Sequence, residues 1–301
     1  ASKTPCSPNA AITPDCFDFA AIAADHPRVP GKRPMLSALS LVLCLGCELP
    51  QTQLAQIEGV AVDVELVLAV DVSRSMDYSE FVLQRAGYVA ALRHPDFIKA
   101  VQTGFHGRIA LTYYEWSSSV REESIVPWQI IDGPETAEAF AAKLEARPFG
   151  GFRGTSISSA IKFGLTMFDM GGFDGIRRVI DVSGDGPNNI GTPVTDARDK
   201  AVDAGIVVNG LPILVRPSPT FKDLDRYYAE CVIGGPGSFV LPIKAPEEFA
   251  TAIRRKLILE VSGVQPDARI VPVQAQEPVD CLKGERDRRF FSDPYYPELD
   301  R

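Results

Sequence analysis

The 301-residue sequence predicts a doubly wound α/β domain with a mostly parallel sheet, one antiparallel edge strand and helices on both faces. Three observations lead to this fold class. Strands alternate with helices along the chain at the spacing of βαβ units. The first strand, Val60–Val70, is an aliphatic run typical of a strand buried on both faces. The third strand follows the second after a short turn, so it should lie antiparallel at an edge.

The remaining elements follow from apolar periodicity and β-branched content. Apolar residues recur at helical spacing over Ser79–Leu92, directly after the first strand. Further strands are predicted at Arg108–Trp116, Ser124–Ile131, Arg178–Val182, Ile206–Leu214 and Ser238–Leu241. Further helices are predicted at Glu135–Leu144, Ser156–Phe168, Pro193–Ala204, Phe221–Glu230 and Pro246–Val261. The segment before Arg108, which holds His94 and His106, is predicted to be a connection.

The two ends of the chain differ from this central part, residues 57–263. Residues 1–56 are interpreted as a leader, because basic Lys32 and Arg33 precede the apolar stretch Leu36–Gly46, as in a secretory signal. A buried core helix is the alternative. The residues around Cys47 resemble a lipoprotein cleavage box, which would give a lipid anchor there; cleavage near Ala55 is the other option.

The C-terminal part, residues 264–301, contains five prolines and many charges of both signs. This composition predicts an extended tail, docked in part through its aromatic residues. The aromatic residues concerned are Phe290, Phe291, Tyr295 and Tyr296. Outside the leader the sequence has two cysteines, Cys231 and Cys281. In an oxidising compartment they would pair and pin the tail to the domain, or they would remain free thiols.

Composition excludes several classes of function. The chain has 31 Lys and Arg against 39 Asp and Glu, a net charge of -8, which argues against a nucleic-acid partner. No apolar run approaches the ~18 residues of a transmembrane helix. Three histidines leave little scope for histidine-based catalysis or a zinc site. No convincing catalytic constellation is present, so the sequence does not predict an enzyme.

Hydroxyl and carboxylate residues occur directly after two predicted strands and at the start of one helix. In open parallel sheets, ligands bind beyond the carboxyl ends of the strands, so these residues should meet at one edge. Such hard oxygen ligands suit Mg²⁺, with Mn²⁺ and Ca²⁺ as alternatives, and do not suit zinc or copper. The predicted metal ligands are Asp71, Ser73, Ser75, Thr155 and Asp185.

Within this set Asp71 and Asp185 could act through waters, and a low ligand charge would favour an incoming carboxylate as the sixth ligand. The alternative is that Asp71, Ser73 and Thr155 cap helices and that Ser183–Gly186 is a polar turn. Glycines at 150, 151 and 154 are interpreted as a lead-in that lets Thr155 approach the ion. Residues 187–189 are expected to shape the rim. Residues 114–116 are either rim contacts or structural residues.

These motifs together resemble a von Willebrand factor A (VWA) domain with its metal-ion-dependent adhesion site, over about residues 59–263. Asp71, Ser73 and Ser75 match its first motif, Thr155 its second and Asp185 its third. The segments Leu68–Ser73, Arg178–Asn189 and Cys231–Gly237 also resemble an uncharacterised bacterial family built on this domain, in which export is common. The resemblance implies a three-layer fold and a metal site, but no assigned activity.

Two residues depart from the VWA pattern. Gly184 stands where many VWA domains have Thr or Ser, and Asp181 lies inside a strand that is usually apolar. Asp181 is interpreted either as a buried acid held by hydrogen bonds or as a residue that orients a metal ligand.

The leading hypothesis is an exported bacterial binding module, periplasmic or envelope-associated, that captures an acidic side chain of a partner protein through the cation. One alternative is a Mg²⁺-dependent hydrolase or phosphotransferase that uses Asp71. Another is a structural assembly factor whose site is occupied but unused.

Overall fold

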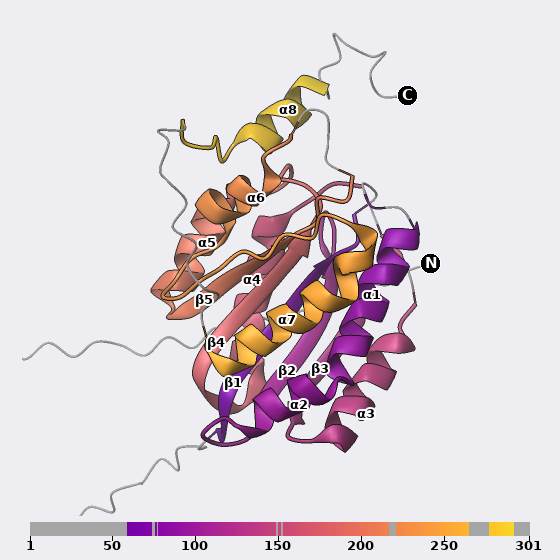
Figure 1. Ribbon diagram of the computed structural model, residues 1–301. Helices are drawn as coiled ribbons and strands as arrows, with labels where there is room; N and C mark the ends of the chain where they lie inside the picture. Colours follow the sequence, from indigo (N-terminus) through magenta and orange to yellow (C-terminus); the bar gives the residue numbers. More distant parts are fainter. Residues whose placement is uncertain are drawn as a thin grey trace, which may run out of the picture. The chain divides into compact units, whose positions relative to one another are not determined.

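Five strands form one sheet in the order β3–β2–β1–β4–β5 (Figure 1). Their bounds are β1 Val60–Asp71, β2 Ile109–Trp116, β3 Val120–Ile131, β4 Phe173–Gly184 and β5 Ile206–Pro212. β1 pairs in parallel with β2 and β4, and β4 pairs in parallel with β5. β3 pairs antiparallel with β2 at the edge. The predicted fold class and the antiparallel edge strand are therefore confirmed.

The computed structural model describes residues 59–73, 76, 78–148, 150–151, 153–216, 221–264 and 277–291. These residues all belong to one compact unit, Ala55–Arg301. The predicted leader with Cys47, the predicted ligand Ser75 and all four aromatic side chains proposed to dock the tail lie outside the described residues or their described side chains.

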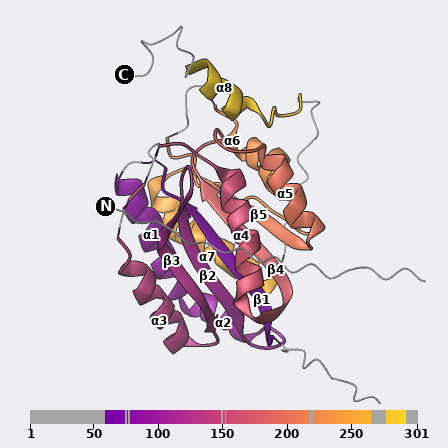
Figure 2. The same cartoon turned by 180° about the vertical axis from the view of Figure 1, so that it is seen from behind.

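Helices cover both faces of the sheet because consecutive residues of β1 point to opposite sides. Leu66 and Leu68 pack with α1, α2, α3 and α7, whereas Val67 and Ala69 pack with α4, α5 and α6. Figures 1 and 2 show these two helical layers from opposite sides. The helices are α1 Tyr78–Leu92, α2 Pro95–Gln102, α3 Pro134–Glu145, α4 Ile157–Gly171, α5 Val194–Asp203, α6 Leu224–Tyr227 and α7 Phe249–Ser262.

The predicted connection before β2 is wrong, because it contains helix α2. His94 caps this helix by accepting a hydrogen bond from the Asp96 N–H, and Pro95 occupies the first turn. Its apolar side includes Phe97 and Val101, both buried, with Ile98 and Ala100 packed beside them. The helix has only eight residues, which is too short a window for apolar periodicity to indicate a helix from the sequence.

Other boundaries also differ from prediction. β4 begins at Phe173, before the predicted Arg178, because its polar first half pairs with the start of β1. The predicted strand Ser238–Leu241 is not formed; this segment meets β5 through one isolated bridge, between Val240 and Gly210. The predicted helix Phe221–Glu230 is the short α6 followed by the π-helical turn η1, Tyr228–Val232.

The C-terminal tail is not extended throughout. Helix α8, Lys283–Phe291, lies within it, so the prediction of an extended tail is wrong for these residues. Cys231 in η1 and Cys281 just before α8 form a disulfide bond, which resolves the alternatives that the sequence left open. Among the described residues, no helix is both long and apolar enough to cross a membrane.

Candidate functional site

The carboxyl ends of β1 and β4 lie side by side where the strand order reverses. In the parallel register Val70 lies opposite Ser183, so the chain leaves both strands at neighbouring positions. β2 lies on one side of β1 and β4 on the other. Such a switch point leaves a crevice in which open α/β sheets bind ligands. Asp71 ends β1 and Asp185 follows β4, so both predicted carboxylates stand at this point.

The first loop, which follows β1 from Val72, turns tightly around the Asp71 side chain. Asp71 is fully buried, and its Oδ1 accepts a hydrogen bond of 2.7 Å from the Ser73 N–H. This local bond is the Asx turn that aspartate favours where a strand ends. Ser73 is also buried, at 1% exposure. The turn therefore holds the Asp71 carboxylate and the Ser73 hydroxyl on one loop at the end of the sheet.

The second loop, between α3 and α4, brings Thr155 close to the first loop and to the third loop, which joins β4 to α5. A Cβ at Gly151 would overlap the carbonyl oxygen of Val72, so only glycine permits this close approach to the first loop. The Thr155 N–H donates to Asn189 Oδ1 at 2.9 Å, and its carbonyl accepts from the Asn189 N–H at 2.8 Å. Thr155 is thereby fixed to residues just beyond Asp185, as expected for the rim.

The packing around the start of the third loop explains why residue 184 is glycine. A Cβ at Gly184 would lie 2.9 Å from Asp71 Oδ2 and 2.7 Å from the Tyr228 hydroxyl. A Ser or Thr side chain has no room there because these two groups fill the space. A Cβ at Gly186 would lie 3.8 Å from Thr155 Oγ1, so the third loop also passes close to the predicted hydroxyl ligand.

Two buried residues beneath the loops were missed by sequence reasoning. Gln84 of α1 donates to the Asp71 carbonyl at 3.0 Å and accepts from the Ser183 hydroxyl at 3.1 Å, so it ties β1 to β4. Tyr228 of η1 lies fully buried against Gly184. Neither residue has a sequence signal, since a glutamine on an amphipathic helix and a tyrosine in an apolar segment are ordinary.

The electrostatics of Asp71 favour a cation. Oδ2 of Asp71 is buried and has no hydrogen-bond partner among the described residues. Burial raises the pKa of Asp71 well above its usual range, and the nearby Asp185 carboxylate raises it further. Burial and the same two acids also raise the pKa of Tyr228. An ion with a double positive charge would offset this repulsion and supply the missing partner.

The donor set fits a hard divalent cation. The described part of the chain contains no group of three or more His, Cys, Asp or Glu that could hold a metal. A site here would therefore combine the carboxylates of Asp71 and Asp185 with the hydroxyls of Ser73 and Thr155. Oxygen donors of this kind suit Mg²⁺, Mn²⁺ or Ca²⁺. The predicted ligand Ser75 lies outside the described residues.

A buried cluster of charges supports the second loop. Glu115 at the end of β2 pairs with Arg85 of α1 and, at 2.9 Å, with Arg121 of β3. Arg85 donates to the carbonyls of Arg147 and Pro148, and Arg121 donates to the carbonyl of Gly150 at 2.8 Å. The two arginines thus hold the segment that leads to Gly151. Of the two roles left open for Glu115, the structure supports the structural one.

Asp181 does not contact the candidate site; it belongs to a second buried ion cluster. Lys256 Nζ of α7 lies 2.9 Å from Asp181 Oδ1 and 2.6 Å from Glu260 Oε1. Asn209 of β5 donates to the other Glu260 oxygen at 2.7 Å. Burial raises the pKa of Asp181 to about 7, although Lys256 lowers it. Asp181 is thus a buried acid, but an ion pair holds it in place of the expected hydrogen bonds, because neither of its oxygens has a hydrogen-bond partner among the described residues.

Solved structures share this fold. Proximal thread matrix protein 1 from the mussel byssus, crystal form 2, is 14% identical with a TM-score of 0.50, over 68% of this chain and 49% of that chain. The pilus adhesin SpaC from Lactobacillus rhamnosus GG is 13% identical with a TM-score of 0.50, over 68% of this chain and 32% of that chain. A von Willebrand factor type A structure from Catenulispora acidiphila is also similar, but its TM-score of 0.48 is too low to support the fold by itself; it is 17% identical over 67% of this chain and 43% of that chain.

At these identities the likeness concerns the fold alone, and the chain spans about half or less of each of these proteins. No curated protein matches the sequence. A family model described as "Protein of unknown function (DUF1194)" matches residues 61–265, which include every described ligand candidate. This match covers more than half of the sequence, and the chain therefore belongs to the DUF1194 family.

Proposed function

We propose that the protein is an exported adhesion-type binding module that holds a divalent cation and captures an acidic group of a partner protein through it. One observation carries this proposal. The Asp71 carboxylate is buried beside Asp185 at the switch point of the sheet, and its Oδ2 has no hydrogen-bond partner among the described residues. A buried charge without a countercharge is costly, so a bound cation accounts for its presence.

In this proposal the cation is held by the two carboxylates and by the hydroxyls of Ser73, Ser75 and Thr155. Mg²⁺ is our first choice, and Mn²⁺ or Ca²⁺ would suit the same donors. The bound ion would supply positive charge that attracts a carboxylate from outside. The residues of the chain would fix the position of the ion and leave one coordination position for the partner.

Export and adhesion have separate support. The disulfide between Cys231 and Cys281 favours an oxidising compartment, such as the bacterial periplasm or the cell surface. The pilus adhesin SpaC, which shares the fold, is an adhesive protein by its title. A lipid anchor at Cys47 and the secretory signal before it remain predictions, since both lie outside the described residues.

Calorimetric titration with Mg²⁺, Mn²⁺ and Ca²⁺ tests the cation site. We expect saturable binding of one ion by the unaltered protein and none by Asp71→Asn, which keeps the side-chain shape and removes the charge. Asp174→Asn is the matched control, because Asp174 is exposed near the opposite end of the sheet, in β4. Equal binding by the two variants, or no binding by the unaltered protein, would contradict the proposal.

The same proteins test the acidic partner. Each is immobilised and exposed to envelope extract, with the cation or with chelator. We expect captured proteins to elute in chelator and to be absent from the Asp71→Asn column. Capture that persists in chelator would mean that the partner is not held through a metal.

A further inference from the structure

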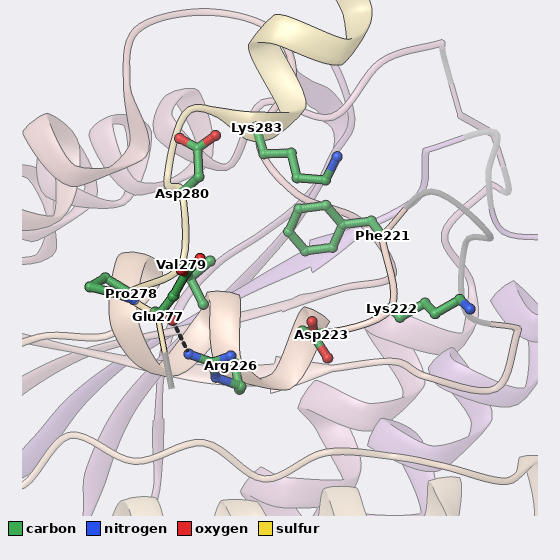
Figure 3. Close-up of a pocket in the computed structure, with 9 residues that line it drawn as sticks. All are labelled: Phe221, Lys222, Asp223, Arg226, Glu277, Pro278, Val279, Asp280 and Lys283. Carbon is green, nitrogen blue, oxygen red and sulfur yellow. Dashed lines mark hydrogen bonds between the residues drawn. The ribbon is translucent and has the colours of Figure 1, made fainter. Parts of the chain in front are cut away.

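The C-terminal segment 277–291 is attached to the domain at several points around η1. The disulfide joins Cys281 to the fully buried Cys231. Arg226 of α6 donates to the Glu277 carbonyl at 2.8 Å (Figure 3). The Val279 N–H donates to Glu230 at 2.7 Å. The disulfide keeps the segment close to this surface, and this raises the effective concentration at which its weaker contacts form.

A cavity of about 360 Å³ lies between this segment and the start of α6. Figure 3 shows Lys283 extending toward Phe221 on one side of it and Arg226 bonded to the Glu277 carbonyl on another. Predicted metal ligands are absent from its lining. The cavity therefore lies beside the anchored part of the segment and the start of α8, and the candidate site does not line it.

Beyond the cavity, α8 lies directly on the third loop. A Cβ at Gly284 would overlap the carbonyl oxygen of Asn188, so the helix can approach this closely only because residue 284 is glycine. Glycine is otherwise a poor helix former, so its presence in α8 is explained by this close contact and not by helix propensity. One turn of α8 thus fits against the rim of the site.

Two polar contacts join α8 to the asparagines that follow Asp185. Glu285 Oε1 accepts a 2.7 Å hydrogen bond from Asn188 Nδ2, and Arg288 donates to Asn189 Oδ1 at 3.3 Å. Asn188 is fully buried, so a donor left without a partner there would be costly. Glu285 therefore completes the hydrogen bonding of Asn188.

Both asparagines in turn hold the second loop. Asn188 Oδ1 accepts from the Ser158 N–H at 3.0 Å in the first turn of α4. Asn189 Oδ1 accepts from the Thr155 N–H at 2.9 Å. The same oxygen of Asn189 thus receives hydrogen bonds from Arg288 and from the backbone of a predicted metal ligand. Two hydrogen bonds connect α8 to Thr155.

We propose that residues 277–291 form a disulfide-tethered strap that holds Asn188 and Asn189. Through Asn189 the strap holds Thr155, and through Asn188 it holds the start of α4, in the position that the cation requires. Gly284, Glu285 and Arg288 are positioning residues in this arrangement. The inference rests on the proposed cation site. Partners that orient metal ligands typically change metal affinity by about 10- to 100-fold when they are removed.

The test compares full-length variants for Mn²⁺ affinity, metal-free melting temperature and amide exchange over residues 153–159. Gly284→Ala displaces the strap while keeping the disulfide, and it should favour the helix itself, so any loss reflects the overlap with Asn188. The double variant Cys231→Ser with Cys281→Ser removes the tether. Arg286→Ala is the control, because Arg286 is exposed and pairs with Asp280.

We expect Gly284→Ala, Glu285→Ala and the double variant to bind Mn²⁺ about tenfold more weakly and to exchange faster over 153–159. Glu285→Gln keeps an acceptor for Asn188 and should restore most of the affinity, and Arg286→Ala should match the unaltered protein. A fall in melting temperature with unchanged Mn²⁺ affinity and exchange would overturn the strap. If the unaltered protein binds no Mn²⁺, the proposed cation site fails, and the exchange data still decide whether the strap holds the loop.

Discussion

Asp71 and Asp181 are both buried acids of the central sheet, but their surroundings differ in one respect. Asp181 and its neighbour Glu260 share the ammonium group of Lys256, which is itself buried. Asp71 has Asp185 as its charged neighbour, and no ion pair of the described residues includes it. Glu115, a third buried acid of the sheet, lies between Arg85 and Arg121.

This difference separates a structural cluster from a candidate binding site. In the Asp181 and Glu115 clusters this fold places a basic side chain beside the buried carboxylate, since an unpaired buried charge is destabilising. At the end of β1 that basic side chain is missing from the described contacts, and the neighbouring acid increases the repulsion. A cation from solution would supply at Asp71 the positive charge that Lys256 supplies at Asp181.

The largest effect is expected at Lys256, the side chain that supplies the positive charge beside Asp181 and Glu260. Lys256→Met should lower the free energy of unfolding by about 3–5 kcal/mol, because two buried carboxylates lose their shared countercharge. Urea denaturation measures the change. The exposed Lys244→Met is the matched control and should change little. A loss below about 1 kcal/mol for Lys256→Met would remove the contrast between the two clusters.

A pH titration of Mn²⁺ affinity tests the environment of Asp71. Burial and Asp185 raise the pKa of Asp71, so its contribution to metal-free stability is complete below the ordinary Asp pKa of about 4 and is lost as pH rises through the raised value. The cation needs the deprotonated form. Mn²⁺ affinity should therefore increase with pH, by up to about tenfold per pH unit while one proton is displaced. Affinity that does not change between about pH 5 and 8 would contradict a protonated Asp71 in the metal-free protein.

Much of the architecture could be predicted from the sequence because burial leaves a strong pattern. The aliphatic run of β1 and the alternation of strands and helices were sufficient for the fold class. Short or polar elements were missed: α2 has only eight residues, and the first half of β4 is polar. At Ser238–Leu241 a single isolated bridge to β5 forms in place of a strand, and composition cannot distinguish such a bridge from a continuous ladder of hydrogen bonds.

The candidate site was predictable to a lesser extent. Strand ends indicated that Asp71, Thr155 and Asp185 should approach one another, and the loops around them do meet. Gln84, Tyr228 and the strap reach the site through tertiary packing and have no local signal. Asp181 was a plausible neighbour of the site by sequence, but its partner Lys256 is far along the chain, on α7.

The most direct measurement is the free energy of unfolding of the unaltered protein and of Asp71→Asn, each in chelator and in Mn²⁺. Asparagine keeps the acceptor for the Ser73 N–H and removes the buried charge. In chelator we expect Asp71→Asn to be the more stable protein, by about 1 kcal/mol or more. With Mn²⁺ at a hundredfold excess over its dissociation constant, only the unaltered protein should gain, by about 2.7 kcal/mol, and the order should reverse. If Asp71→Asn is less stable in chelator and the unaltered protein does not respond to Mn²⁺, Asp71 is a structural acid like Asp181, and the candidate site does not bind a cation.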